Sequence, residues 1–398
     1  MRRPPSTSSG AIISALCIFG LHCCCLVLCA CAQSSVQTLD AGWPALTAMS
    51  IPEVVLPGPS ETAQFTRDGK KLMIVAESSV RIWDTQKWDP IGIPLRPERG
   101  SNFIKASFDA TGERVLTVAY TDSDSFSRES DEVKVWEVRT GTQVGPPIRH
   151  RGKSVTDADI SPNGDLIATA NWHDRTVHIW CATTGELIHS FDHHQEIEWV
   201  QFDWTGAMLI TTGWQTHTWD IQTRQARKVL PSNAVTDAGR ARPGISATGR
   251  IVVPAAGGFE VYDLDRGALL LRKLFLVDSR LFVAFLAISQ DGSRVVVSVS
   301  GQLSVWDVDS GNELVSYPST EWKARLGPGG TLLALASGEH RGIWDLRADH
   351  RLHSGTPEEL WRDIAFSPDG RRIAISAAER TIVRTIKWIT PDHSTESR

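Results

Sequence analysis

The sequence predicts an all-β fold made of repeated four-stranded antiparallel sheets, and two recurring phrases predict it. The first phrase is an apolar residue, two variable residues, a small or polar residue and a glycine, as in Phe366–Gly370 (Phe-Ser-Pro-Asp-Gly). It occurs eight times, at intervals of 38 to 52 residues. Self-similarity at a nearly fixed period indicates a repeat architecture. The eight glycines are Gly69, Gly112, Gly164, Gly206, Gly249, Gly292, Gly330 and Gly370.

The second phrase is an alternating strand that ends in an aromatic residue and usually an acid, as in Val80–Asp84 (Val-Arg-Ile-Trp-Asp). It follows seven of the turn phrases; the eighth unit has only Ile382–Thr385, and Trp388 comes three residues late. Period-two alternation bounded by Gly, Pro and Asp predicts short strands joined by tight turns. A further short apolar run, such as the one that ends at Val315, supplies a fourth strand. The seven aromatic residues are Trp83, Trp136, Trp180, Trp219, Tyr262, Trp306 and Trp344.

Together these phrases resemble the WD40 repeat family, and the resemblance extends from about Ser50 to Trp388. It implies a single β-propeller, in which four-stranded blades surround a channel and each blade packs on the next. The count of phrases predicts eight blades. Seven is the alternative, because the first unit lacks a turn Asp and the eighth has lost its Trp. We expect Ile51–Leu56, which precedes the first unit, to complete the eighth blade and close the ring.

The first 32 residues predict an export signal or a membrane anchor. Arg2 and Arg3 precede an uncharged, mostly apolar stretch over 11–32, and this order is typical of a secretory signal. Three fates stay open: cleavage before Gln33, lipidation of Cys31 in the lipobox-like Leu28–Cys31, or retention as an uncleaved transmembrane anchor. All three place the rest of the chain on the exported side, in the cell envelope, the periplasm or the extracellular space.

Composition narrows the function of the remaining chain, which divides into a linker over 33–50, the propeller over 51–388 and a polar tail over 389–398. Six of the seven Cys lie in the leader. The exported part therefore keeps Cys181, and Cys31 if it is lipidated, without an internal disulfide framework. With 41 basic and 46 acidic residues, the chain lacks the positive field of a nucleic-acid binder. We expect no nucleic-acid partner, and membrane contact only through the N-terminal segment.

The third unit carries the structural tetrad of WD40 repeats most fully, with His150, Thr169, Asp174 and Trp180. The resemblance implies that indole, hydroxyl, imidazole and carboxylate form a buried hydrogen-bonded chain. Thr, His and Asp together also resemble a hydrolase constellation. No G-x-S-x-G elbow, P-loop or H-E-x-x-H motif accompanies them, so the structural interpretation is favoured. We therefore expect no catalytic residue, no enzyme activity and no cofactor.

Three further features carry weaker signals. Cys181 stands where the repeat usually has Asp, and such a strand cysteine is more often an inert small hydrophobe than a reactive thiol. His193 and His194 would begin a metal site with Glu196, but neighbouring side chains point apart, so no metal is predicted. The acidic insertion over 121–131 lacks the Gly and terminal Glu of a calcium loop, so a solvated loop is favoured.

Surplus tryptophans give the best functional hint. Apart from Trp43 in the linker and the late Trp388, seven of the 15 Trp lie outside the blade position, and exposed aromatic residues mark contact sites, although buried ones would serve as core. The seven are Trp88, Trp172, Trp199, Trp204, Trp214, Trp322 and Trp361. We predict a candidate interaction face that contains Trp172, His173, Trp322 and Trp361.

The predicted function is that of an exported, non-catalytic scaffold that holds an unidentified protein or peptide partner through this face of the propeller. The alternative is a propeller enzyme, or a small-ligand or metal binder, that uses the central channel.

Overall fold

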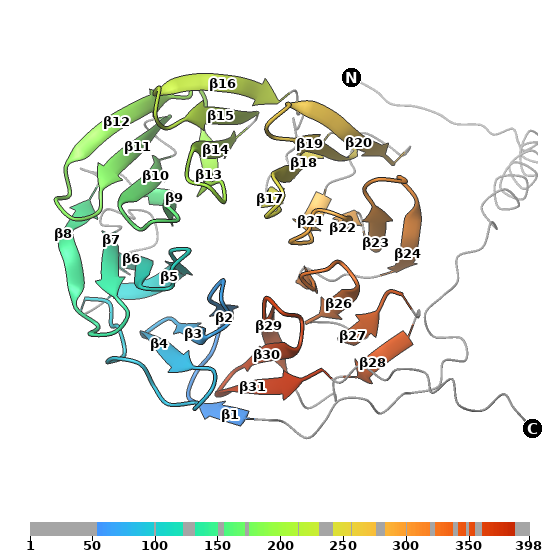
Figure 1. Ribbon diagram of the computed structural model, residues 1–398, viewed down its shortest axis with the longest axis horizontal. Helices are drawn as coiled ribbons and strands as arrows, with labels where there is room; N and C mark the ends of the chain where they lie inside the picture. Colours follow the sequence, from blue (N-terminus) through green and yellow to red (C-terminus); the bar gives the residue numbers. More distant parts are fainter. Residues whose placement is uncertain are drawn as a thin grey trace, which may run out of the picture. The chain divides into compact units, whose positions relative to one another are not determined.

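The computed structural model forms a ring of eight β-sheets around a central channel (Figure 1). All its regular elements in the described residues are strands, and this confirms the predicted all-β, eight-bladed propeller. The leader, the linker and the tail lie outside those residues. The structure describes residues 54–98, 101–121, 132–149, 155–171, 175–213, 215–230, 242–255, 257–275, 283–299, 301–318, 323–336, 341–347, 350–354 and 360–386.

Each blade is an antiparallel sheet whose strands follow one another from the channel to the rim. Blade 1 contains β2 (Thr62–Phe65), β3 (Lys71–Ala76) and β4 (Ser79–Asp84). Blade 2 contains β5 (Ser101–Phe108), β6 (Arg114–Thr121), β7 (Glu132–Glu137) and β8 (Gln143–Arg149). Blade 3 contains β9 (Val155–Ile160), β10 (Leu166–Asn171), β11 (Thr176–Cys181) and β12 (Leu187–Asp192). Blade 4 contains β13 (Ile197–Phe202), β14 (Met208–Gly213), β15 (Thr216–Asp220) and β16 (Gln225–Leu230).

The second half of the ring repeats this arrangement. Blade 5 contains β17 (Gly244–Ile245), β18 (Arg250–Ala255), β19 (Gly258–Asp263) and β20 (Ala268–Leu274). Blade 6 contains β21 (Val283–Ile288), β22 (Arg294–Val299), β23 (Gln302–Asp307) and β24 (Glu313–Pro318). Blade 7 contains β25 (Ala324–Leu326), β26 (Leu332–Leu335), β27 (Gly342–Asp345) and β28 (His350–Ser354). Blade 8 contains β29 (Trp361–Phe366), β30 (Arg372–Ala377), β31 (Arg380–Thr385) and, at the rim, β1 (Val54–Pro57).

Blade 8 closes the ring with a strand from the other end of the propeller sequence. Strand β1 pairs antiparallel with β31, with Val54 opposite Val383 and Pro57 opposite Arg380. The buried hydroxyl of Thr381 donates to that of Ser60, at 2.9 Å, just behind this pairing. The expected completion of the eighth blade by the segment before the first unit is thus confirmed.

The recurring glycines occupy the turn between the first and second strands of each blade. All eight have positive φ, between 63° and 77°, a conformation that glycine adopts without a steric penalty. The polar residue before the turn often accepts the first backbone N–H of the second strand: Ser161 accepts from Leu166 at 2.9 Å, and Ser367 from Arg372 at 2.8 Å. The repeated phrase is therefore explained by turn chemistry.

The hydrophobic core lies between blades. One buried cluster joins Met73 and Ile82 of blade 1 to Phe103 and Val115 of blade 2, and similar clusters join other neighbouring blades. A cation at the start of the second strand adds a polar link: Arg114 donates to the carbonyl of Gly164 in the next blade at 2.6 Å. Because each blade buries its faces on its neighbours, the closed ring is the stable unit.

Blade 1 departs from the predicted four-stranded pattern. Its outer segment forms only isolated bridges, Val80 to Leu95 and Trp83 to Pro90, so the sheet has three regular strands. Pro90, Pro94 and Pro97 fall in this segment, and proline has no N–H to donate to a ladder. In the described part of the chain, no helix is long and apolar enough to cross a membrane.

Candidate functional site in the central channel

Three blades anchor the indole of the third strand with a threonine of the second strand. The Nε1–H of Trp136 donates to Thr117 at 2.8 Å, and that of Trp180 donates to Thr169 at 2.9 Å. The third pair is in blade 4, where Trp219 donates to Thr211 at 2.8 Å. In each blade, the residue of the second strand that pairs with the tryptophan lies two positions before the threonine. The predicted Thr169–Trp180 link of the tetrad is therefore present.

In blade 4 these hydrogen bonds extend to a histidine that sequence reasoning missed. Nε2 of His193 shares a hydrogen bond of 2.8 Å with the hydroxyl of Thr211, and its side chain is only 2% exposed. Burial and the neighbouring His217, whose ring centroid is 3.9 Å away, lower the pKa of His193 to about 3. Glu196 and His194 take no part in these hydrogen bonds. The signal was the position of His193 just before a first strand, as for His150 in the third unit.

The other predicted site residues are only partly covered by the structure. His150 and Asp174 of the tetrad, Trp172, His173 and Trp322 of the interaction face, and the lipidation candidate Cys31 lie outside the described residues. Among the residues that are described, no three His, Cys, Asp or Glu side chains converge as a metal site.

Trp361 requires a correction. It begins β29 but is 5% exposed, and it packs in the cluster between blades 7 and 8 with Leu332 and Ile364. The residue therefore belongs to the core and offers no contact surface. Its place at the start of a first strand was compatible with both burial and exposure, because sequence spacing does not fix the direction of the side chain.

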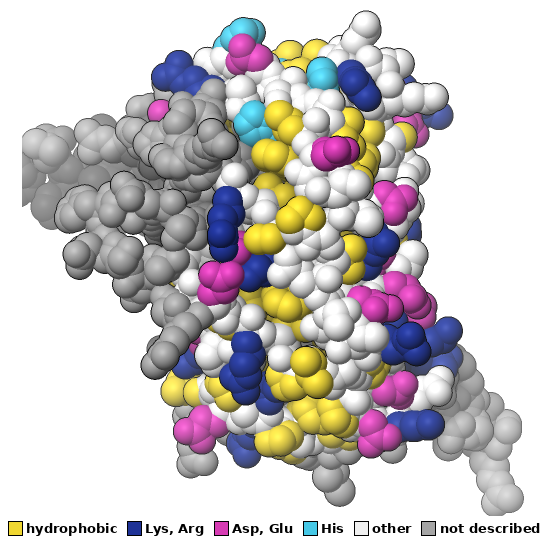
Figure 2. Space-filling view, turned by 90° about the vertical axis from the view of Figure 1, so that its left-hand side faces the viewer, with side chains coloured by type: hydrophobic (Ala, Val, Ile, Leu, Met, Phe, Trp, Pro, Cys, Tyr) yellow, Lys and Arg dark blue, Asp and Glu magenta, His cyan; other side chains and the backbone are white. Residues whose placement is uncertain are grey.

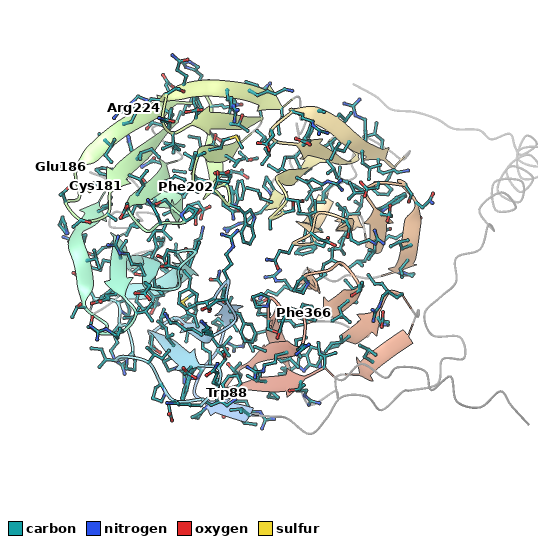
Figure 3. The ribbon with its side chains drawn as sticks, in the orientation of Figure 1. Trp88, Cys181, Glu186, Phe202, Arg224 and Phe366 are labelled. Carbon is teal, nitrogen blue, oxygen red and sulfur yellow. The ribbon has the colours of Figure 1, made fainter. Side chains whose placement is uncertain are left out.

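The remaining described surplus aromatics also have structural partners. Trp199 is 5% exposed, the guanidinium of Arg372 lies 5.7 Å from the ring of Trp88, and that of Arg67 lies 4.2 Å from the ring of Trp204. Phe202 and Phe366 lie on the inner side of the ring, whereas Cys181, Glu186 and Arg224 lie near its outer side (Figure 3). Hydrogen bonds from Thr184 and the backbone lower the pKa of Cys181.

Two cavities occupy the central channel. The first, of about 570 Å³, lies where the first strands begin and is called the start-side chamber; it is lined by Glu61, Thr62, Phe103, Lys105, Arg242, Arg325 and Asp363. The second, of about 620 Å³, lies toward the glycine turns and is called the turn-side chamber. Both chambers share Gln64, Lys105 and Gln290. Their volumes lie in the range of ligand pockets.

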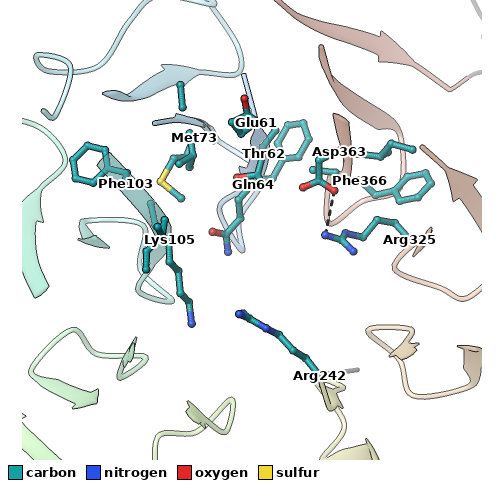
Figure 4. A pocket seen from close by; sticks show the side chains of 18 of the residues that line it. Glu61, Thr62, Gln64, Met73, Phe103, Lys105, Arg242, Arg325, Asp363 and Phe366 are labelled. Carbon is teal, nitrogen blue, oxygen red and sulfur yellow. Dashed lines mark ion pairs between the residues drawn. The ribbon is translucent and has the colours of Figure 1, made fainter. Parts of the chain in front are cut away.

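Both chambers have mixed walls of apolar and charged side chains. In the turn-side chamber, Phe, Trp and Pro residues lie beside Asp109, Asp159 and Asp203, and Arg67 of blade 1 reaches Trp204 of blade 4. The start-side chamber is charged (Figure 4): Arg325 pairs with Asp363 at 3.2 Å, and Lys105 pairs with Asp157 at 2.7 Å. These two ion pairs join neighbouring blades beside the start-side chamber.

A β-bulge helps to shape the start-side wall. The register of β5 against β6 shifts between Phe103 and Lys105, and an extra residue of this kind bends a strand and redirects side chains. Similar shifts occur at Ile197/Trp199 in blade 4 and Trp361/Asp363 in blade 8. The extra residues there are Glu198 and Arg362, and Arg362 forms an ion pair with Glu61.

Two aspartates of β9 connect blade 3 to blade 4 beside the channel. Asp157 accepts the backbone N–H of Val200 at 3.2 Å, and Asp159 accepts that of Phe202 at 2.9 Å. Burial raises the pKa of Asp159 to about 6, and the charge of Lys105 opposes this rise. The carboxyl of Asp159 is therefore harder to ionise than that of an ordinary aspartate.

The outer rim is a second exposed surface. Figure 2 shows hydrophobic side chains along the middle of the rim, with charged groups on both sides. Exposed apolar residues of the outer strands are Val55, Leu187, Ile188, Val229, Leu269, Leu270, Leu274 and Leu314. They are spread over several blades and line neither of the two chambers, so the channel remains the better defined site.

Comparison with known proteins supports the WD40 propeller family. Residues 143–181, from β8 to β11, match the family model "WD domain, G-beta repeat". A structure titled "Crystal Structure of Mitotic Checkpoint Complex" contains a similar chain, with a TM-score of 0.56, 13% identity and coverage of 90% of this chain and 97% of that one. At this identity the likeness concerns the fold alone.

Curated relatives match parts of the chain. The U3 small nucleolar RNA-associated protein 15 homolog of Xenopus tropicalis is 25% identical over 230 residues, which are 55% of this chain and 42% of that protein. Eukaryotic translation initiation factor 3 subunit I of Aspergillus oryzae is 31% identical over 113 residues, 28% of this chain and 30% of that protein. The matched regions thus span less than half the length of these relatives.

Proposed function

We propose that this chain is a non-catalytic, exported WD40-type propeller scaffold that holds a protein or peptide partner through the start side of the ring. The observation that carries the proposal concerns the hydroxyl of Thr169, which belongs to the hydrolase-like set of Thr, His and Asp side chains. Thr169 is fully buried, and its oxygen accepts the indole N–H of Trp180. A nucleophile must reach its substrate. The role of Thr169 is therefore to join two strands of the blade.

The start side is also where the neighbours of the predicted face residues lie. Asn171, at the end of β10, pairs with Val155 at the start of β9, and Ala324 begins β25. Trp172 follows the first of these positions, and Trp322 precedes the last by two residues. These positions support one contact face that includes the start-side chamber, with Trp361 no longer part of it.

Affinity capture with the full chain tests this proposal. A partner retained from envelope extracts should be lost when Trp172 and Trp322 are both replaced by Ala. It should be kept by Trp204→Ala, which removes an aromatic residue from the turn side. Retention by the double variant, with loss on Trp204→Ala, would assign the contact to the opposite side of the ring.

The proposed export rests on Arg2, Arg3 and the apolar stretch over 11–32. Mass spectrometry of the mature N-terminus separates its three proposed fates: a chain that begins at Gln33, a lipid-modified Cys31, or an intact leader. Cys31→Ala should release the protein from membranes only in the lipidated case. A chain with an intact N-terminus that remains in the cytoplasm would contradict export.

A further inference from the structure

The start-side chamber contains one cation that the protein does not balance itself. Lys105 has Asp157, Arg325 has Asp363, and Arg362, near the same mouth, has Glu61. Arg242 lines the same chamber and forms no ion pair or hydrogen bond with any residue that the structure describes. A guanidinium in a cavity without a carboxylate leaves a directional set of five donors free.

The guanidinium of Arg242 points toward a second cation, the ammonium of Lys105. Figure 4 shows the side chains of Lys105 and Arg242 pointing toward one another across the channel. Asp157 does not lie free between them, because it is buried and its second oxygen accepts the N–H of Val200. An anion between the two side chains would balance the charge of Arg242 and could accept a further N–H of the Lys105 ammonium, which has three donors.

We propose that the start-side chamber binds a carboxylate, held between the guanidinium of Arg242 and the ammonium of Lys105. Arginine binds carboxylates with two parallel N–H donors, and such charge-assisted bonds are the strong ones. The amide of Gln64 also lies beside the two cations (Figure 4) and supplies a neutral donor. This inference rests on the proposed partner-binding function, and it identifies the partner as an acidic peptide or a small carboxylic acid.

Acidic groups near the chamber set a limit on the affinity. Glu61 is engaged by Arg362, and Glu77 lies in the chamber wall. Glu198 forms no ion pair with Arg242, but its charge interacts with the arginine; burial and Glu196 raise its pKa. Removal of the Glu198 charge should therefore strengthen binding of an anion, whereas removal of the Arg242 charge should weaken it.

The test uses the full chain, glutarate as a small probe and a fluorescein-labelled hexaglutamate peptide as the polymeric probe. Calorimetry and fluorescence anisotropy measure the two affinities. Arg242→Gln should weaken both by about tenfold or more, and Glu198→Gln should tighten both. Arg380→Gln, which removes an exposed cation from β31, next to the rim strand β1, is the matched control and should change neither.

The outcomes separate this inference from the proposed function. Glutarate binding alone identifies a small acid as the ligand, and hexaglutamate binding alone identifies a peptide; both support the site if Arg242→Gln weakens them. Absence of binding to both probes, or equal binding by a folded Arg242→Gln variant, overturns it. A captured partner that is retained by Arg242→Gln would leave the scaffold proposal intact while removing the carboxylate site. Binding of glutarate without any captured partner would support the carboxylate site and contradict the scaffold proposal.

Discussion

Blades 4 and 6 place an indole at the same position but surround it differently. In blade 4 the N–H of Trp219 meets the hydroxyl of Thr211, which also bonds to His193. In blade 6 the equivalent residue is Val297, and the buried N–H of Trp306 has no hydrogen-bond partner in the described structure. Trp306 packs instead against Phe259 and Phe275.

This difference shows that the repeat requires the aromatic bulk more than it requires the hydrogen bond. Blade 1 agrees with blade 6, because Trp83 also has an unpartnered N–H and Ile74 stands at the threonine position. Where the threonine is present, however, its hydroxyl is buried, and the groups that bond to it would be left without a partner if it were removed. We therefore expect mutations to cost more in blades 2 to 4 than at the same positions in blades 1 and 6.

The largest effect should come from Thr211→Val. This change keeps the shape of the side chain but leaves both the indole of Trp219 and the imidazole of His193 without a partner, at a cost of about 3 kcal/mol in the free energy of unfolding. Thr117→Val is the matched control in blade 2, where only the bond from Trp136 is lost, and it should cost about 1 kcal/mol. Urea unfolding measures both. Equal costs would mean that His193 contributes nothing to the anchor.

The second-largest effect should be a loss of folding stability in acid, caused by His193 of blade 4. The pKa of His193 is lowered to about 3 in the folded chain, below its ordinary 6.5, so the unfolded chain binds the proton more tightly. Stability from this group is complete above pH 6.5 and falls as the pH drops toward 3, by about 2 kcal/mol at pH 5.

His193→Gln removes this titration and should flatten stability between pH 6.5 and 4. His217, whose pKa burial also lowers, stays in the variant and contributes a slope of the same sign, whereas Asp159 and Glu198, whose pKa values burial raises, contribute slopes of the opposite sign. An unchanged pH profile in urea unfolding would place the acid sensitivity elsewhere.

The smallest effect should come from a hydroxyl added to blade 6. Val297→Thr places an acceptor near the free N–H of Trp306, so the gained bond offsets the burial of the hydroxyl, and we expect a change within about 1 kcal/mol. Val296→Thr buries a hydroxyl on the other face of the same strand and should cost about 2 kcal/mol. Similar losses in both variants, measured by thermal unfolding, would show that the position of Val297 does not match that of Thr211.

Features that depend on local, repeated chemistry were predictable from the sequence. The eight turn glycines require positive φ, so their spacing counts the blades, and the short segment with Val54 is the strand that the eighth unit lacked. The Thr169–Trp180 bond was expected from the resemblance to WD40 repeats, and the strand register, which places the threonine near the indole, explains it.

Features that depend on which way a side chain points were not predictable. Trp361 and Trp199 are buried although they lie on inner strands. His193 forms a hydrogen bond with Thr211, 18 residues later, although its closeness in the sequence suggested a set with His194 and Glu196. Arg242 gave no signal, because its isolation follows from how the other cations are paired across blades. The prolines of blade 1 were visible in the sequence, but their effect on its outer strand became clear only in the structure.

The pairing of β1 with β31 also has a consequence for synthesis of the chain. Val54 and Val383 are neighbours in the sheet, although almost the whole propeller lies between them in the sequence, and such distant contacts form late because loop closure must precede them. Blades 2 to 7 contain only consecutive strands, so each can assemble as it leaves the ribosome. Blade 8 has to wait for β31, and until then the first and last faces of the ring are exposed together. These faces are where aggregation or binding by a chaperone should begin in the incomplete chain.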